Sequence, residues 1–250
     1  MGCRLHRARV LSATLTLVAL AGGCATAAGP ATRSDVIRQI LPSTVQLRCE
    51  RDGGDRRAAS GVVVGRDRAT RRAWIVTTRH FLEPLAPQTV YVAVAGRRGR
   101  MAASLVRVSE RADLALLEVS DVDAAPARLK ERVQLGDEVW VVAFPWGRRM
   151  TLSSGVVSQI VRDDGDERYE GAARMVDVSV SYGASGGGVF DAPTGALVGL
   201  VESYRTARMT MTGSPERVIE IPVPGETTLI AADAIRRFIV EAGLESVLAE

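Results

Sequence analysis

One serine of the sequence stands within a run of glycines. Gly183-Ala184 precedes Ser185, and three consecutive glycines, residues 186–188, follow it. Because glycine has no side chain, the backbone here can approach a bound carbonyl group and aim its N–H groups at one point. A hydroxyl nucleophile beside an oxyanion hole needs both properties. Glycine-serine runs are equally typical of turns and linkers, so the chemistry depends on a base and an acid elsewhere in the chain.

A candidate base and a candidate acid both occur at the ends of apolar runs. Beyond residue 23 the sequence has a single histidine, His80, which follows the run 74–78 after one arginine. Imidazole titrates near neutral pH and so serves as a general base, although a lone histidine is more often structural. Asp113 precedes the run 114–117 and by itself reads as a turn residue or cap. Together with Ser185 they occur in the chain order of chymotrypsin-type hydrolases.

The elements that must position these residues are short strands. Apolar and β-branched runs, separated by glycine and proline, occupy 44–49, 60–64, 74–78, 90–94, 101–108, 114–119, 138–144, 151–161, 175–180, 189–190 and 196–201. Such a series predicts an all-β barrel or sandwich. The polar segment 121–131 is interpreted as a crossover between two halves. We expect a short helix capped by Ser34-Asp35, and a closing helix after Ala231, where apolar residues recur at helical spacing.

Four blocks of sequence also occur in the order found in one known family. They are Ser60-Gly61-Val62-Val63-Val64 with Ile75-Val76-Thr77-Thr78-Arg79-His80, Ala112 to Leu117, Gly136 to Gly147 with Ser154 to Ser158, and Asp177 to Gly187. From about Ser34 to Phe238 the chain resembles the trypsin-like serine proteases of the HtrA/Deg type. The resemblance implies a chymotrypsin-like double β-barrel with a short N-terminal and a C-terminal helix. The protease domain would span 34–250, with barrels at about 44–120 and 132–230 and the closing helix at about 231–242.

The resemblance also assigns roles in the site. His80 would be the general base, Asp113 would orient it, Ser185 would be the nucleophile, and the N–H groups of Gly183 and Ser185 would form the oxyanion hole. No metal or other cofactor is implied. The primary substrate pocket would be walled by the strand after the nucleophile and the strand before the last helix, which supply Leu200, Val201, Thr228 and Leu229. No charged residue stands at its floor, so we expect a small or medium apolar side chain to be preferred.

The chain departs from the family pattern near the nucleophile and farther along. Ala184 replaces the family's asparagine, and Gly188 replaces a proline. Neither residue carries a proton in the mechanism. The segment 213–226 is longer than the usual connection, and no PDZ domain is expected after the protease part.

The N-terminus reads as an export signal. Basic residues precede the apolar stretch 10–21, which is too short for a stable transmembrane anchor. Residues 1–23 would be the signal peptide and 24–33 a flexible tether. Cys24 follows Ala21-Gly22-Gly23 as the lipidated cysteine does in bacterial lipoproteins, so a membrane anchor is expected there. The alternative is ordinary cleavage after residues 25–27, which would release a soluble periplasmic or secreted protein.

The charge of the chain gives no indication of nucleic-acid binding, and its cysteine content leaves no pair for an internal disulfide. Three of the 32 basic residues lie in the leader, so 29 basic residues face 29 acidic ones in the remainder. A neutral chain gives no indication of nucleic-acid binding. Apart from Cys3 and Cys24 there is only Cys49, which excludes an internal disulfide and reads as a small buried or half-buried residue.

Three functions remain open on the sequence alone. The first is a serine endopeptidase of the bacterial cell envelope that acts on peptides or unfolded proteins. The second is a catalytically latent trypsin-like domain that binds a peptide or protein in the same cleft. The third is an esterase or other acyl hydrolase, although an α/β-hydrolase elbow requires a helix after the nucleophile and the run after Ser185 is strand-like. Nothing in the sequence indicates an oligomeric state.

Overall fold

The computed structural model describes residues 32–51, 54, 56–85, 88–122, 124–161, 169–211 and 217–248. The predicted leader, Cys24 and nearly all of the predicted tether lie outside the described residues. Among the described residues, no helix is long and apolar enough to cross a membrane.

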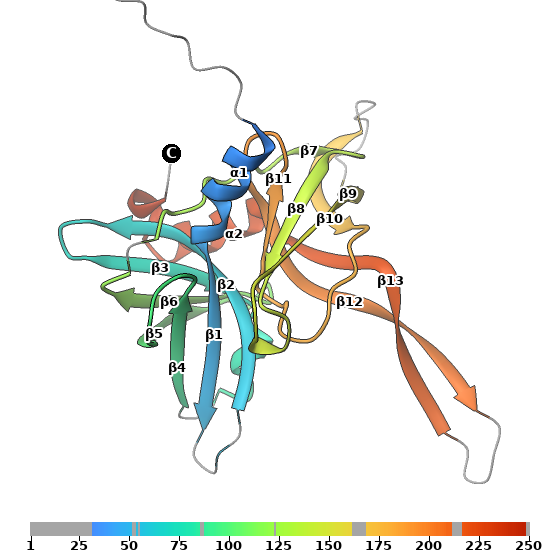
Figure 1. Cartoon of the computed structure of the whole chain (residues 1–250), viewed down its shortest axis with the longest axis horizontal. Coiled ribbons are helices and arrows are strands. Elements are labelled where there is room, and N and C mark those ends of the chain that lie inside the picture. Colours follow the sequence, from blue (N-terminus) through green and yellow to red (C-terminus); the bar gives the residue numbers. More distant parts are fainter. Residues whose placement is uncertain are drawn as a thin grey trace, which may run out of the picture. The chain divides into compact units, whose positions relative to one another are not determined.

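The first half of the described chain is a closed six-stranded antiparallel barrel (Figure 1). Its strands are β1 (Thr44–Arg51), β2 (Arg56–Asp67), β3 (Arg72–Thr77), β4 (Gln88–Val94), β5 (Met101–Val108) and β6 (Ala115–Ser120). They pair in the order β1-β2-β3-β6-β5-β4. Alternate residues of β1, including Val45, Leu47 and Cys49, are buried in the barrel core, as the period of two in a strand requires.

The second half forms another barrel. Its strands are β7 (Val133–Gln134), β8 (Glu138–Ala143), β9 (Thr151–Val161), β10 (Glu170–Val176), β11 (Gly188–Asp191), β12 (Leu197–Met211) and β13 (Arg217–Ala231). The sheet order is β13-β12-β11-β8-β9-β10-β7, and β13 also pairs with β10. This last pairing joins Met175 to Thr228 and Val176 to Thr227, which closes the sheet. The predicted double barrel is confirmed.

Helices lie at both ends of the domain. Helix α1 (Arg33–Ile40) is capped by Thr32, whose side chain and that of Asp35 form a reciprocal capping box. The prediction that Ser34-Asp35 forms the cap is therefore wrong, because Asp35 is the third helical residue and binds back to Thr32. Helix α2 (Ala232–Glu241) buries Ile235, Phe238 and Ile239 at the expected spacing. The described residues also contain the short 3-10 segments η1 (Leu41–Ser43), η2 (Arg79–Leu82), η3 (Pro145–Gly147) and η4 (Glu245–Val247).

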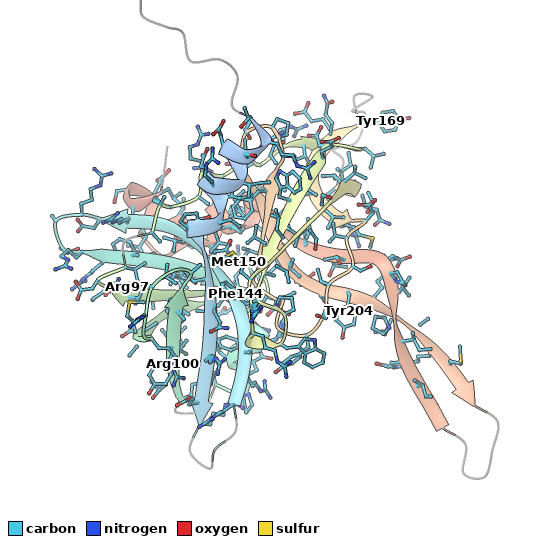
Figure 2. The ribbon with its side chains drawn as sticks, viewed as in Figure 1. Arg97, Arg100, Phe144, Met150, Tyr169 and Tyr204 are labelled. Carbon is cyan, nitrogen blue, oxygen red and sulfur yellow. The ribbon has the colours of Figure 1, made fainter. Side chains whose placement is uncertain are left out.

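Several element boundaries differ from the predictions, among them the end of β10 and the extent of β12 and β13. Strand β10 ends at Val176 rather than at residue 180, since the carboxylate of Asp177 accepts the N–H of Val156 at 2.6 Å in place of a further strand residue. Segment 213–226 is interpreted from the sequence as a connection. From Arg217 onward it is instead part of β13, paired with β12 in a long hairpin that extends beyond the rest of the barrel (Figure 1). In Figure 2, Tyr204 lies where this hairpin leaves the barrel.

Candidate active site

His80 and Asp113 meet because the strands before them are neighbours. His80 lies in η2, directly after β3, and Asp113 lies two residues before β6, which pairs with β3. Asp113 accepts two hydrogen bonds from the histidine: its Oδ2 lies 2.5 Å from the ring Nδ1, and its Oδ1 lies 2.8 Å from the backbone nitrogen. The carboxylate thus fixes both the ring and the turn that carries it. With Nδ1 engaged, the other ring nitrogen, Nε2, is left for proton transfer.

The two groups shift each other's titration. The hydrogen bond to Asp113 raises the pKa of His80, although burial acts in the opposite direction. Burial by itself would raise the pKa of Asp113, but the hydrogen bonds from His80 outweigh it, and the pKa lies below its ordinary value. An ionised carboxylate beside the ring favours the imidazolium that forms when a base accepts a proton.

Ser185 stands in a tight turn before β11. The turn is closed by Ala184 N–H donating to Ser181 C=O at 3.0 Å and by Gly187 N–H donating to Ala184 C=O at 2.8 Å. Gly183 has a φ of 87°, a conformation that favours glycine. Within the described part of the chain, the N–H groups of Gly183 and Ser185 have no hydrogen-bond partner. Free donors beside a hydroxyl are what an oxyanion hole provides.

A buried serine of the first barrel clamps this turn. Ser60 of β2 is fully buried; its hydroxyl donates to Gly183 C=O at 2.9 Å and accepts Phe144 N–H at 2.8 Å. Its backbone N–H donates to Ser185 C=O at 2.9 Å, and its own C=O accepts the Thr77 hydroxyl at 2.7 Å. Phe144, labelled in Figure 2, lies between the two barrels. Ser60 therefore holds the nucleophile turn against the first barrel.

No functional role is predicted for Ser60 from the sequence. The available signal is one polar residue at the start of the apolar run 60–64. Buried hydroxyls require partners, so such a residue indicates a specific polar contact.

His80, Gly183 and Ser185 share one cavity of about 240 Å³. It is lined by Arg57, Ala58, Ala59, His80, Phe81, Tyr182, Gly183 and Ser185. Larger hollows of about 490 to 570 Å³ lie beside α1 and near the C-terminal segment. They contain none of the candidate catalytic residues, so the chemistry and not the volume identifies the site.

The residues predicted for the primary pocket lie elsewhere. Leu200, Val201 and Leu229 are buried in the hydrophobic cores of the domain. Thr228 is half-buried, and its hydroxyl donates to Ser203 C=O at 3.3 Å. None of the four lines the cavity that holds His80 and Ser185. Their role as a substrate pocket stays a prediction. Among the described residues there is also no group of three or more metal-ligating side chains.

A family model decides the relationship of this chain. The trypsin-like peptidase domain matches residues 59–200, more than half of the sequence. The chain belongs to the trypsin-like peptidase family. The match begins just before Ser60 and ends after Ser185, so it includes Ser60 and all three candidate catalytic residues.

Relatives with known names agree with that assignment. A DegP-like probable periplasmic serine endoprotease of Brucella suis is 31% identical over 204 residues, 77% of this chain and 36% of the relative. Its counterpart in Bartonella henselae is 33% identical over 179 residues, 68% of this chain and 32% of the relative. The chain thus spans about a third of the length of these curated relatives.

Two solved structures share the fold. The HtrA-type protease AlgW with a tripeptide superposes with a TM-score of 0.64 at 19% identity, covering 87% of this chain and 65% of that one. A serine endoprotease from Yersinia pestis superposes with a TM-score of 0.61 at 20% identity, covering 87% and 68%. At these identities the likeness concerns the fold alone.

Proposed function

We propose that this protein is a serine endopeptidase of the bacterial cell envelope that cleaves peptides or unfolded proteins. The observation that carries the proposal is the cavity in which the carboxylate-bound His80 and the glycine-flanked Ser185 stand together. The peptidase family and the relatives named as serine endoproteases support it. The tripeptide in the AlgW structure supports a peptide substrate.

The mechanism uses only groups of this chain. His80 Nε2 accepts the proton of the Ser185 hydroxyl as its oxygen attacks the substrate carbonyl, and the C–N bond then breaks as the same proton passes to the leaving amine. Asp113 keeps the ring in the required tautomer and stabilises the imidazolium. The free N–H groups of Gly183 and Ser185 stabilise the oxyanion. Water then attacks the acyl-enzyme while His80 accepts one of its protons. His80 returns this proton to the Ser185 oxygen as the ester bond breaks, which releases the acid and restores the hydroxyl.

The leader and the relatives support the proposed location in the envelope. We interpret residues 1–23, with their apolar stretch 10–21, as an export signal, and the relatives are named periplasmic. Lipidation at Cys24 would hold the domain at a membrane, with residues 25–33 as tether. Intact mass of the protein purified from cells tests this: we expect an N-terminal Cys24 with a diacylglyceryl group on its sulfur, with or without a third acyl chain on its amino group. An unmodified N-terminus near residue 28 would overturn the anchor.

The function is tested with an unfolded protein and a pair of matched small substrates. Wild-type protein should cleave a reduced, unfolded model protein, and both Ser185→Ala and His80→Ala should lose that activity while remaining folded. A peptide amide and the corresponding ester separate a peptidase from an esterase. Turnover of the ester alone would contradict the proposal. A folded wild type that binds the unfolded protein without cleaving it would favour the latent binding domain instead.

A further inference from the structure

Two large aromatic side chains stand in solvent next to the nucleophile turn. Trp146 is 63% exposed and Tyr182 is 48% exposed. Their ring centroids lie 5.5 Å apart at an interplanar angle of 40°. The two residues are also joined through the backbone, because Trp146 N–H donates to Tyr182 C=O at 2.7 Å. Tyr182 directly precedes Gly183 and lines the catalytic cavity, so the pair borders the cleft.

The exposed position of Trp146 is held in place from the first barrel. Its φ of 57° is uncommon for a bulky residue and costs conformational energy. The two carbonyl groups after it are bound from β1: Arg48 donates to Gly147 C=O at 2.8 Å, and Gln46 donates to Arg148 C=O at 2.9 Å. Strained backbone that its surroundings hold fixed is typical of functional positions. An aromatic pair kept rigid and in solvent is typical of a binding surface.

Uncompensated positive charge lies on the same side of the cleft. Arg57 lines the catalytic cavity, and its guanidinium donates to Glu83 C=O at 2.6 Å. Among the described residues Arg57 has no carboxylate partner. The side chain of Glu83, whose backbone carbonyl it binds, is paired instead with Arg79 at 2.9 Å. Arg148, two residues after Trp146, is exposed and likewise has no carboxylate partner in the described structure.

The chemistry of the site indicates which half of a substrate meets this surface. Strand β12 flanks the nucleophile turn on one side through Val201, which bonds to Gly186 and Gly187. Strand β2 flanks it on the other side and supplies the cavity wall, together with His80. His80 delivers the proton to the leaving amine. The leaving half of a bound peptide therefore extends from His80 over the wall that β2 provides.

We propose that Arg57, Trp146 and Tyr182 form a surface that binds the leaving half of the substrate. This surface selects an acidic side chain, through Arg57, and an aromatic or large apolar one, through the ring pair, within the first three residues after the cleaved bond. The inference rests on the proposed endopeptidase function. It adds to that function a substrate class: polypeptide segments that carry acidic and aromatic residues just after the cleavage site.

Internally quenched peptides with one common acyl half test the selection. Their leaving halves carry Asp, Ala or Lys at one of the first three positions. For wild type we expect kcat/KM to be about three- to tenfold higher for Asp than for Lys at the responsive position, as for a partly exposed ion pair. Arg57→Glu should invert the order. Because the comparison is a ratio within one variant, a general loss of activity does not obscure it.

A matched control and an aromatic series complete the experiment. Arg68 is an exposed arginine just beyond the other end of β2, and Arg68→Glu should keep the wild-type order. In a second series, Phe replaces Ala at one of the first three positions after the cleaved bond. This replacement should raise kcat/KM for wild type, and Trp146→Ala should remove most of that gain.

The possible results distinguish a failure of the proposed surface from a failure of the proposed endopeptidase function. Inversion by Arg57→Glu but not by Arg68→Glu supports the surface. Equal rates for the Asp and Lys peptides with wild type, or an unchanged order in Arg57→Glu, would overturn the surface and leave the endopeptidase function standing. A folded wild type that cleaves no peptide would overturn both.

Discussion

Replacing Ser60 by alanine should weaken both the fold and the nucleophile. The change removes a buried hydroxyl that bridges Gly183 C=O and Phe144 N–H. Each buried group left without a partner costs about 1–3 kcal/mol. Part of this is offset because the hydroxyl itself no longer has to be desolvated. We therefore expect the free energy of unfolding to fall by about 2–4 kcal/mol.

The effect on chemistry follows from the position of the lost contact. Gly183 supplies one proposed oxyanion donor, and removal of such a donor costs about 10²–10³ in rate. Because Ser60→Ala displaces the donor without deleting it, we expect the rate of labelling by a fluorophosphonate to fall about 10- to 100-fold. The assays are guanidinium denaturation and timed labelling followed by mass spectrometry.

Ser43 provides the matched control. It is also a buried serine, and its hydroxyl donates to Ile40 C=O at 2.7 Å, at the end of α1. Ser43→Ala should destabilise the fold by about 1 kcal/mol and leave the labelling rate unchanged. If Ser60→Ala loses stability as expected but is labelled within about twofold of the wild-type rate, the contact is structural only and does not position the oxyanion donor.

Three further predictions concern titration, a buried charge and the turn. The labelling rate of wild type should rise with pH through an apparent pKa above the ordinary 6.5 of histidine, since only neutral His80 accepts a proton and its hydrogen bond to Asp113 raises its pKa. Asp113→Asn should lower both that midpoint and the rate, the latter by about 10⁴; a pH profile with an unmoved midpoint would contradict the pairing. Lys130→Met should lower the free energy of unfolding by about 2–3 kcal/mol, because Asp191, whose side chain is 3% exposed, loses the ammonium 2.5 Å away; equal denaturation midpoints would show that the pair is not needed. Gly183→Ala should nearly abolish labelling, because a Cβ would lie 2.7 Å from a backbone nitrogen of the β8–β9 connection at a φ of 87°; labelling at the wild-type rate would mean that the turn relaxes.

The parts of the site that sequence could predict are those with local signals. Glycines around Ser185, and apolar runs before His80 and after Asp113, are patterns within a few residues of the group they position. The structure brings His80 and Asp113 into direct contact and places Ser185 on the same cavity. Their catalytic roles stay predictions until activity is measured.

The parts that sequence could not predict depend on distant contacts. Ser60 bonds to groups 84 and 123 residues away, and no local pattern records such partners. The prolines in segment 213–226 argue against a strand there. An exposed hairpin edge tolerates proline, although a central strand does not. There the cross-strand pairing of residues 206–211 with 217–222 prevails over composition. The cap at Thr32 was missed because Ser34-Asp35 is an equally good local candidate.

The proposed function requires Ser185 to be an activated nucleophile. The most direct measurement is the intact mass and peptide map of folded protein after reaction with a fluorophosphonate, beside Ser185→Ala and His80→Ala. We expect a single adduct at Ser185 in wild type and none in either variant. A folded wild type that gains no adduct, or an adduct that persists in Ser185→Ala, would contradict the proposed function.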